Sequence, residues 1–290
     1  MIILFTDTDT DITPSLAKEY GYNLISMPYS IEEKEIYPYV DFEKFDYKSF
    51  YNLLRSGVLP KTSAISPVAY MEYFEPYLKE GHDILYVHFS AAMSGTFSAL
   101  HIAEEELKEK YPDRKIYKID TKGISILSYI IVKEISLLHK QGKTIEEILE
   151  WAEKEVDKFA IYFYVDDLKF FQRSGRVSGF SAFMGNILGI HPIIHVSNEG
   201  KMEAISKGKG KLGTLKKILT YIDEIQEDIK DHQVLIAHTD AEDIAIILSN
   251  MLKEKYGEDL DIEIVVVNPT IGSHCGPDCV GVTFHATHRK

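Results

Sequence analysis

The chain has 290 residues, enough for one large domain or two ordinary ones, and its 45% hydrophobic and 27% charged residues are typical of a globular protein. A net charge of −13 argues against broad nucleic-acid binding, because such binding depends on neutralising phosphates. No apolar run approaches the roughly 20 residues that cross a bilayer, so stable membrane insertion is not expected either.

The amino terminus starts with a short apolar run, residues 2–5, which predicts a β-strand. Asp7 follows almost at once, whereas a secretory leader needs a basic stretch and then a longer apolar one. We therefore expect a cytoplasmic protein. A short helix is predicted next, over residues 14–20.

Apolar runs and helix-like segments alternate through the first half of the chain. Ser66 followed by Pro67 is typical of a helix start, with an N-cap residue and then proline in the first turn. The predicted strands are residues 83–89 and 115–119, and the predicted helices are residues 67–78, 96–110 and 125–139. This alternation predicts a parallel sheet that is covered on both faces.

The pattern changes after a capping box at Thr144 and Glu147, which starts another helix. Apolar runs on both sides of Ser-Asn-Glu-Gly, residues 197–200, predict a β-hairpin. The remaining predicted strands are residues 159–165, 193–196, 202–205, 233–238 and 262–267, and the helices are residues 179–187, 214–228 and 240–256. We expect a two-domain α/β protein, with a parallel sheet in residues 1–155 and a mixed or antiparallel sheet in residues 156–290.

Three carboxylates alternate just after the first strand, at Asp7, Asp9 and Asp11. They could hold Mg²⁺, and the spacing of Asp9, Asp11 and Thr13 matches the aspartyl-phosphatase pattern of the haloacid-dehalogenase group. In that pattern the first aspartate stands at the strand end, a place that Asp7 fills here. The alternative is a turn whose Asp and Thr side chains cap the following helix.

Two loops rich in hydroxyl groups precede predicted helices. Thr62 and Ser63 lie in the first loop, and Ser94, Gly95 and Thr96 lie in the second, which follows a strand of the predicted parallel sheet. Ligands of open α/β sheets usually bind at the carboxyl ends of the strands. Hydroxyls and free backbone N–H groups there favour an anion, although each hydroxyl alone could be a helix cap.

Further polar motifs lie in the second half. Arg173 and Arg176 flank Ser174-Gly175, which could be a solvated basic turn at the end of a helix. His274 has small neighbours, so it could reach a ligand as a proton donor or acceptor.

The two cysteines, Cys275 and Cys279, imply no disulfide framework. Together with His274, His285 and His288 they allow a zinc site as an alternative, although the Cys-x₃-Cys spacing differs from the common zinc knuckle. A catalytic Cys275 is another alternative, but no matching base can be assigned.

In their order and spacing, these motifs resemble the DegV family over nearly the whole chain. The most specific segments are Thr62-Ser63, Ser94-Gly95-Thr96, Val165-Asp166-Asp167-Leu168, Arg173-Ser174-Gly175-Arg176-Val177, Ile271-Gly272-Ser273-His274 and Gly276-Pro277. The resemblance implies two α/β domains with one long-chain fatty acid, such as palmitate, stearate or oleate, buried between them. It also implies a bacterial carrier subunit without catalysis or cofactor, which presents the acid to a separate ATP-dependent fatty acid kinase for phospholipid synthesis.

Carried over residue by residue, the resemblance assigns the fatty-acid carboxylate to Thr62 and Ser94, with Ser63 and Thr96 as neighbours and His274 close by. The side that faces the kinase is assigned to Lys209, which replaces the arginine usual in the family, and to Arg173 and Arg176.

Other positions depart from the family. Ser90-Ala91 lacks one of two usual serines, residues 123–129 are bulkier than the usual glycine-rich stretch, and His191 replaces a common lysine. Besides a lipid carrier and a Mg²⁺-dependent phosphatase, a third function is considered, in which the basic segment of residues 201–217 docks an acidic partner without any ligand.

Overall fold

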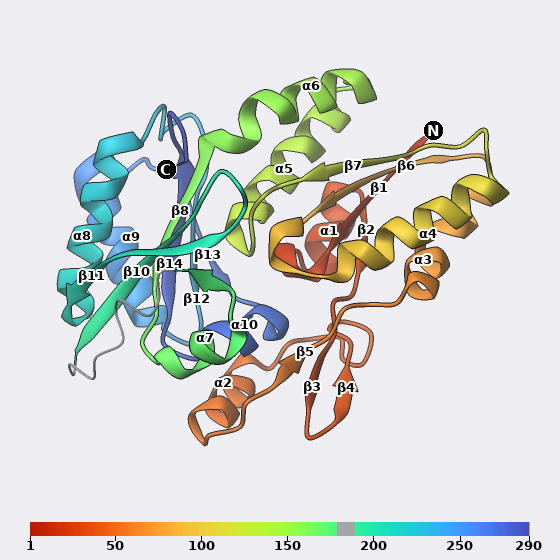
Figure 1. The fold of residues 1–290 in the computed structure, drawn as a ribbon. Helices are drawn as coiled ribbons and strands as arrows, with labels where there is room; N and C mark the ends of the chain where they lie inside the picture. Colours follow the sequence, from red (N-terminus) through yellow and green to blue (C-terminus); the bar gives the residue numbers. More distant parts are fainter. Residues whose placement is uncertain (179–188, 290) are drawn as a thin grey trace.

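The computed structural model describes residues 1–178 and 189–289, and the helix predicted at residues 179–187 lies outside them. Two sheets lie side by side, with a long helix between them (Figure 1). This arrangement confirms the predicted α/β class, with a parallel sheet in the first half and a mixed sheet in the second.

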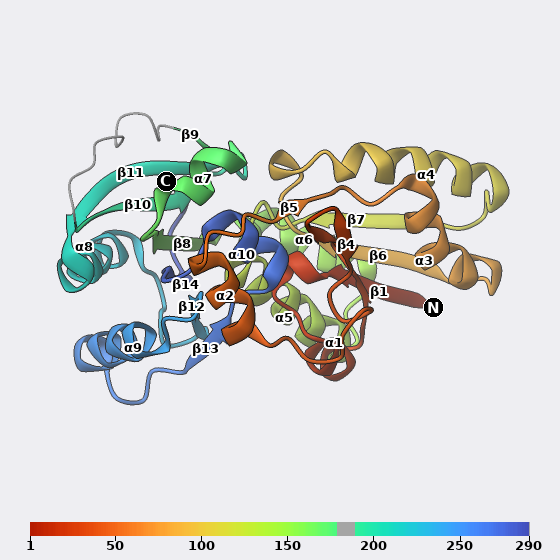
Figure 2. The ribbon, with the colours of Figure 1, turned by 90° about the horizontal axis from the view of Figure 1, so that it is seen from below.

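The first sheet has four parallel strands in the order β2-β1-β6-β7. Its strands are β1 (Ile2–Asp7), β2 (Tyr22–Ile25), β6 (Asp83–His88) and β7 (Ile116–Asp120). The helices α3 and α4 lie on one face, and α1 and α5 lie on the other (Figure 2). These helices are α1 (Pro14–Tyr20), α3 (Pro67–Lys79), α4 (Thr96–Lys110) and α5 (Ile126–Lys140).

A small three-stranded sheet below the first was not predicted. It pairs β3 (Tyr29–Ile31) with β4 (Lys34–Ile36) and β5 (Lys61–Thr62), and helix α2 (Tyr47–Arg55) lies beside it (Figure 1). Its strands are only two or three residues long, too short for a detectable alternation of apolar and polar residues. This unit places Thr62 next to the segment of residues 269–275 in the second half of the chain.

The second sheet is mixed and has the order β13-β12-β14-β8-β10-β11-β9. Its strands are β8 (Phe159–Tyr164), β9 (Val177–Ser178), β10 (Ile190–Val196), β11 (Met202–Lys209), β12 (Val234–His238), β13 (Ile262–Val266) and β14 (Val280–His285). The helices that follow α5 along the chain are α6 (Ile145–Glu155), which packs against α5, and then α7 (Leu168–Ser174), α8 (Gly210–Ile225), α9 (Glu242–Tyr256) and α10 (Pro269–Cys275). The predicted hairpin is confirmed, since β10 and β11 pair antiparallel around residues 197–200.

Helix α8 begins four residues earlier than predicted, because Gly210 has a φ of 65° and turns the chain directly from β11 into the helix. Three short 3₁₀ helices complete the described elements: η1 (Thr8–Thr10), η2 (Ala91–Met93) and η3 (Val156–Lys158).

Strand β8 is buried on both faces, because helices cover both sides of the second sheet. Phe159, Ile161 and Phe163 pack toward α5, whereas Tyr162 and Tyr164 pack toward α8 and α9. Successive side chains thus point to opposite faces of the sheet, as they do in any extended strand. Burial on both faces explains why the sequence there is an uninterrupted apolar run.

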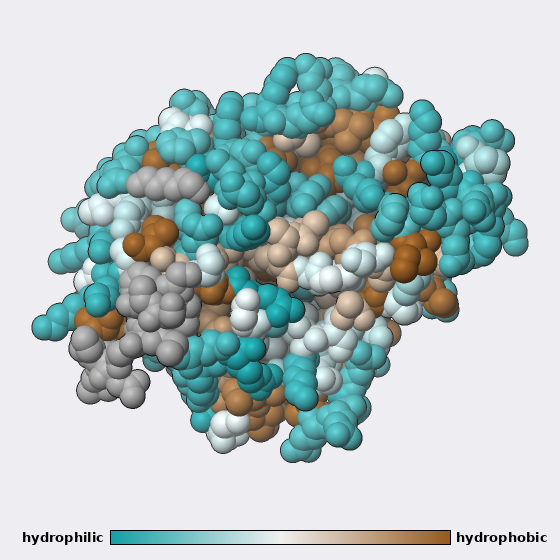
Figure 3. Space-filling model, in the orientation of Figure 1, coloured by the Kyte–Doolittle hydropathy of each residue, from teal (hydrophilic) through white to brown (hydrophobic). Residues whose placement is uncertain are grey.

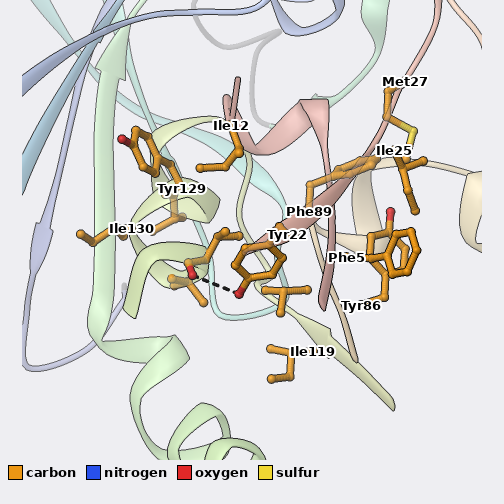
Figure 4. Close-up of a cluster of buried hydrophobic side chains, with 14 of the residues drawn as sticks. Phe5, Ile12, Tyr22, Ile25, Met27, Tyr86, Phe89, Ile119, Tyr129 and Ile130 are labelled. Atoms are coloured by element: carbon orange, nitrogen blue, oxygen red, sulfur yellow. Dashed lines mark hydrogen bonds between the residues drawn. The ribbon is translucent and has the colours of Figure 1, made fainter. Parts of the chain in front are cut away.

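One hydrophobic core continues from the first sheet to the inner face of the second. Figure 4 shows its N-terminal part, where Phe5, Tyr86 and Phe89 lie near Met27 and where Tyr22 donates a hydrogen bond to the carbonyl of Val132. Helix α5 is buried along its first two turns and touches η1 and α1 as well as β8, β12 and β14. The two halves are therefore joined by shared apolar packing.

The surface in the view of Figure 3 is mostly hydrophilic and is broken by small separate apolar patches. Within residues 1–178 and 189–289, no helix is long and apolar enough to cross a membrane.

Candidate functional site

A cavity lies where the carboxyl ends of β1 and β6 face the inner side of the second sheet. Its empty space is about 1140 Å³, including the part that is open to solvent. The walls are mainly apolar side chains from both halves of the chain: Met27, Phe89, Met93, Ile124, Ile126, Ile161, Phe163, Phe171, Met202, Ala237, Val267, Ile271 and Val280. A concave, mainly apolar space with a few polar groups is the usual form of a small-molecule site.

Thr62 and His274 meet at the wall of this cavity although they are 212 residues apart. The hydroxyl oxygen Oγ1 of Thr62 lies 2.9 Å from Nε2 of His274. Pairing of β5 with β3 positions Thr62. Helix α10 positions His274, and this helix begins at Asn268, whose side chain accepts hydrogen bonds from the N–H groups of Thr270 and Ile271.

Ser63 and Ser94 also line the cavity, so four of the five predicted head-group residues share one site. Ser94 precedes α4, and its hydroxyl oxygen accepts a hydrogen bond from the N–H of Thr96 at 3.2 Å. The hydroxyl proton of Ser94 is left available to donate. Thr96 differs, because it is buried and its hydroxyl lies 3.1 Å from the hydroxyl of Tyr70, away from the cavity wall.

Arg173 and Arg176 hold the two hydroxyl loops from the side of α7. The guanidinium of Arg173 donates to the carbonyl oxygens of Leu59 and Pro60, just before Thr62. Arg176 lines the cavity and donates from Nε to the carbonyl of Met93 at 3.1 Å, just before Ser94. Lys209 is exposed at the start of α8 and is not part of the cavity wall.

His274 is neutral near pH 7. Burial, with the positive charges of Arg176 and Arg173 acting in the same direction, lowers the pKa of its imidazole from the ordinary 6.5 to about 4. A neutral imidazole can donate from Nε2 to Thr62, which leaves the hydroxyl proton of Thr62 free for another acceptor. The site thus offers hydroxyl donors beside two arginines, an environment that suits an anion.

Asp7 and Asp11, which follow the apolar part of β1, stabilise the turn around η1 through hydrogen bonds. Asp7 accepts a hydrogen bond from the Tyr86 hydroxyl at 2.9 Å and two more from backbone N–H groups. Asp11 accepts from the Ser125 hydroxyl and, at 2.8 Å, from both the backbone and the side-chain N–H of Asn268. These contacts support the interpretation of Asp7 and Asp11 as bracing groups, and they tie the first sheet to α10.

Burial also changes the charge of these acids. It raises the pKa of Asp7 to about 7 and that of Asp11 to about 6, against hydrogen bonds that act in the opposite direction. In the part of the chain that the structure describes, no group of three or more His, Cys, Asp or Glu side chains is placed to hold a metal ion. Asp9 differs from its neighbours, because it lines the cavity.

Cys275 and Cys279 belong to the cavity wall as thiols. Burial raises the pKa of both, to about 12 for Cys279, which keeps them protonated and poorly nucleophilic. Two of the three histidines considered for a zinc site are engaged elsewhere: Nδ1 of His285 lies 2.9 Å from the carbonyl oxygen of Glu227, and Nδ1 of His288 lies 2.8 Å from the Thr287 hydroxyl.

The apolar walls are what sequence reasoning missed. Phe163 and Ala237 lie in strands whose every residue is apolar or buried, so no local pattern separates the residues that face the cavity from the others. The buried Thr239 and Thr270 also line the cavity, but their hydroxyls bond to the backbone of Cys279 and Met27. Only the way in which the two sheets face each other, which is a property of the fold, identifies the residues that line the cavity.

Comparison with known proteins finds a matching family model over residues 1–287, described as DegV, an uncharacterised protein family. A DegV domain-containing protein of Clostridium perfringens is 36% identical over 282 residues, which cover 97% of this chain and 96% of that protein.

Two solved structures show the same fold over nearly the whole chain. A fatty-acid-binding DegV family protein of Streptococcus agalactiae is 26% identical, with a TM-score of 0.85 and 98% of each chain covered. A DegV lipid-binding protein of Thermotoga maritima is 25% identical, with a TM-score of 0.84 and with 100% of this chain and 99% of the other covered.

Proposed function

Because the chain belongs to the DegV family, we propose that it is a non-catalytic carrier that holds one long-chain fatty acid, such as palmitate, stearate or oleate, in the cavity between its two sheets. The observation that carries this proposal is the contact between Thr62 and His274, which sets polar hydrogen-bonding groups at the wall of an otherwise apolar cavity. An apolar tail with one anionic end is complementary to that arrangement.

The tail would supply most of the affinity. A saturated C16 acid has about fourteen methylenes, each worth roughly 0.8 kcal/mol on burial, a gross gain of about 11 kcal/mol before the costs of association. The carboxylate would supply the orientation, since a buried charge without partners is costly. Ser94 and Thr62 would each donate one hydrogen bond to it, with Ser63 and His274 beside them.

The arginines would make the head-group end of the cavity favourable for a negative charge. Arg173 and Arg176 lie close enough to His274 to lower the pKa of its imidazole. Their N–H groups are directed at backbone carbonyls of the two hydroxyl loops. A carboxylate would therefore bind to neutral hydroxyl donors, which leave one of its oxygens accessible.

We further propose that the carrier works in the cytoplasm and presents this carboxylate to a separate ATP-dependent fatty acid kinase. Lys209 is exposed and outside the cavity, so it would contact the kinase and not the acid. The exposed sides of Arg173 and Arg176, next to the hydroxyl loops, would be part of the same docking surface.

Binding is tested by native mass spectrometry of the purified protein and by organic extraction after denaturation. We expect added mass of roughly one C16–C18 acid, and a higher melting temperature when palmitate is added to delipidated protein. A protein without added mass whose melting temperature does not change with palmitate or oleate would contradict the carrier function.

Presentation to a kinase is tested by acyl-phosphate formation with a bacterial fatty acid kinase, ATP and the loaded carrier. Lys209→Ala should lower the rate, and less so at high salt, because salt screens surface charges. Lys108→Ala, an exposed lysine on α4, is the matched control and should leave the rate unchanged. Equal rates for both variants would contradict docking through Lys209.

A further inference from the structure

Asp9 is a buried acid with an unused hydrogen-bonding atom. Its side chain lines the cavity, the residue is only 8% exposed, and its Oδ1 has no hydrogen-bond partner among the described residues. Buried polar atoms are almost always paired, because an unpaired one loses its hydration without compensation. An unpaired carboxyl oxygen in the wall of a ligand cavity indicates that a ligand group completes the pairing.

The backbone fixes Asp9 in this position. Its N–H donates to Oδ1 of Asp7 at 3.0 Å, and its carbonyl accepts from the N–H of Ser125 at 2.9 Å. Both hydrogen bonds are buried, so they hold η1 against the start of α5. The neighbouring acids Asp7 and Asp11 are occupied by other donors. Asp9 is thus held at the cavity wall, where its free oxygen has no other described partner.

The charge state of Asp9 determines what it can bind. Burial raises its pKa well above the ordinary value, and the nearby charges of Asp7 and Asp11 raise it further. A protonated carboxyl group both donates and accepts a hydrogen bond. Its natural partner is a neutral group that does the same, such as a hydroxyl, whereas the ligand's own carboxylate could accept from it but not donate to it.

Asp9 also lies on a different element from the head-group residues. The hydroxyl donors stand on β5 and before α4, and His274 stands on α10, whereas Asp9 stands on η1. Most of the other side chains that line the cavity near the turn of Asp9 are apolar, among them Met27, Phe89 and Ile126. Ser125 also lines the cavity there, but its hydroxyl donates to Asp11. This is the environment of an acyl chain with one polar contact along its length.

We propose that Asp9 forms a second polar subsite that binds a hydroxyl group on the acyl chain, so that the preferred ligand is a hydroxy fatty acid. The inference rests on the proposed function, since it needs the carboxylate to bind at Thr62 and Ser94. An unsubstituted chain would leave the carboxyl group of Asp9 unpaired, whereas a chain hydroxyl would pair with it. Because Asp9 is fixed, the preference should depend on the position of the hydroxyl along the chain.

The test is competitive binding of octadecanoic acid and of its 3-, 10- and 12-hydroxy derivatives to delipidated protein. We expect one hydroxy acid to bind about tenfold more tightly than octadecanoic acid, which corresponds to about 1.4 kcal/mol. Asp9→Leu, of similar size but without hydrogen-bonding groups, should reverse this order. Asp9→Asn, which still donates and accepts, should keep it. Asp113→Leu, at an exposed position, is the control and should change neither affinity.

The outcomes separate the two proposals. Binding of octadecanoic acid with no preference for any hydroxy acid would overturn the subsite and leave the carrier function standing, and so would a preference that survives in Asp9→Leu. Failure of every acid to bind would contradict both. If Asp9→Leu does not fold, the affinities of wild type and of Asp9→Asn for the four acids still test the subsite. Both proteins must then bind one hydroxy acid more tightly than octadecanoic acid.

Discussion

His274 lines the cavity and also affects the stability of the folded protein through the pKa of its imidazole. The pKa of its imidazole falls to about 4 in the folded state from an ordinary 6.5, so between these pH values the unfolded chain binds more protons than the folded one. The contribution of a neutral His274 to stability is therefore complete above pH 6.5. It is lost progressively as the pH falls toward 4.

His274→Gln tests this linkage, because glutamine can still bond to Thr62 but does not titrate. We expect the unfolding free energy of wild type, relative to the variant, to fall between about pH 6.5 and pH 4 by at most about 1.4 kcal/mol per pH unit. Urea denaturation across this range measures the difference. Asp7 and Asp11 titrate in both proteins, so their effects cancel. If the unfolding free energies of wild type and His274→Gln changed with pH in the same way, His274 would not be held neutral by the fold.

Asn268 joins the first sheet to α10 through three kinds of contact. Its side-chain N–H groups donate to Asp11 and to the carbonyl of Thr8, its backbone N–H donates to Asp11, and its side-chain oxygen caps α10. Asn268→Ala should lower the unfolding free energy by about 2–4 kcal/mol, since it removes a cap and leaves buried acceptors unpaired. Asn250→Ala, at an exposed position of α9, should change it by less than about 0.5 kcal/mol. If Asn268→Ala and Asn250→Ala lowered the unfolding free energy equally, the bracing role of Asn268 would be contradicted.

At the scale of elements, α10 is positioned by its packing against α2. A Cβ atom on Gly272 would lie 2.6 Å from the hydroxyl oxygen of Tyr51, and that hydroxyl already donates to the carbonyl of Val267 at 2.9 Å. Tyr51 is completely buried, so it cannot move aside without disturbing α2. The close approach of the two helices therefore sets the position of His274 relative to Thr62.

Gly272→Ala should push α10 away from α2. We expect a loss of about 1–3 kcal/mol in unfolding free energy from overpacking, together with weaker fatty-acid binding. Gly213→Ala is the matched control, because a Cβ there meets no atom within 4 Å and Gly213 lies inside α8, so alanine should stabilise the protein by about 0.5–1 kcal/mol. Thermal unfolding and ligand titration measure both effects. A Gly272→Ala protein as stable as wild type would contradict this packing.

Elements with a strong local signal could be predicted from the sequence. Helix α6 begins where Thr144 and Glu147 form both hydrogen bonds of a capping box, and Ser66 caps α3 as expected. Helix α2 was not predicted although its signal is present, since Asp46 caps it and the buried Phe50, Tyr51 and Leu54 follow helical spacing. The β5 strand carries no such signal. Thr62 lies in a two-residue strand whose position depends on pairing with β3, a contact that is distant in sequence.

At the scale of the whole molecule, the shared packing of the two halves is what creates the cavity. Ile126 comes from α5, Ile161 from β8 and Ile271 from α10, and each lines the same space. No sequence pattern indicates that these residues face each other, since each belongs to an ordinary apolar run. The motifs still indicated four residues that line this cavity, because hydroxyl groups in loops and a histidine among small residues are unusual in the walls of a core. Their role as head-group ligands stays a prediction.

We propose that the carboxylate of a fatty acid binds at Thr62 and Ser94, and the affinity of palmitate for delipidated variants measures the contribution of each hydroxyl. A hydrogen bond to a charged group contributes about 1.5–3 kcal/mol, so Thr62→Ala and Ser94→Ala should each weaken binding by about 10- to 150-fold. Ser98→Ala, an exposed serine in the first turn of the same α4, should change the affinity less than about twofold. Equal affinities for wild type, Thr62→Ala and Ser94→Ala would mean that the carboxylate binds elsewhere in the protein.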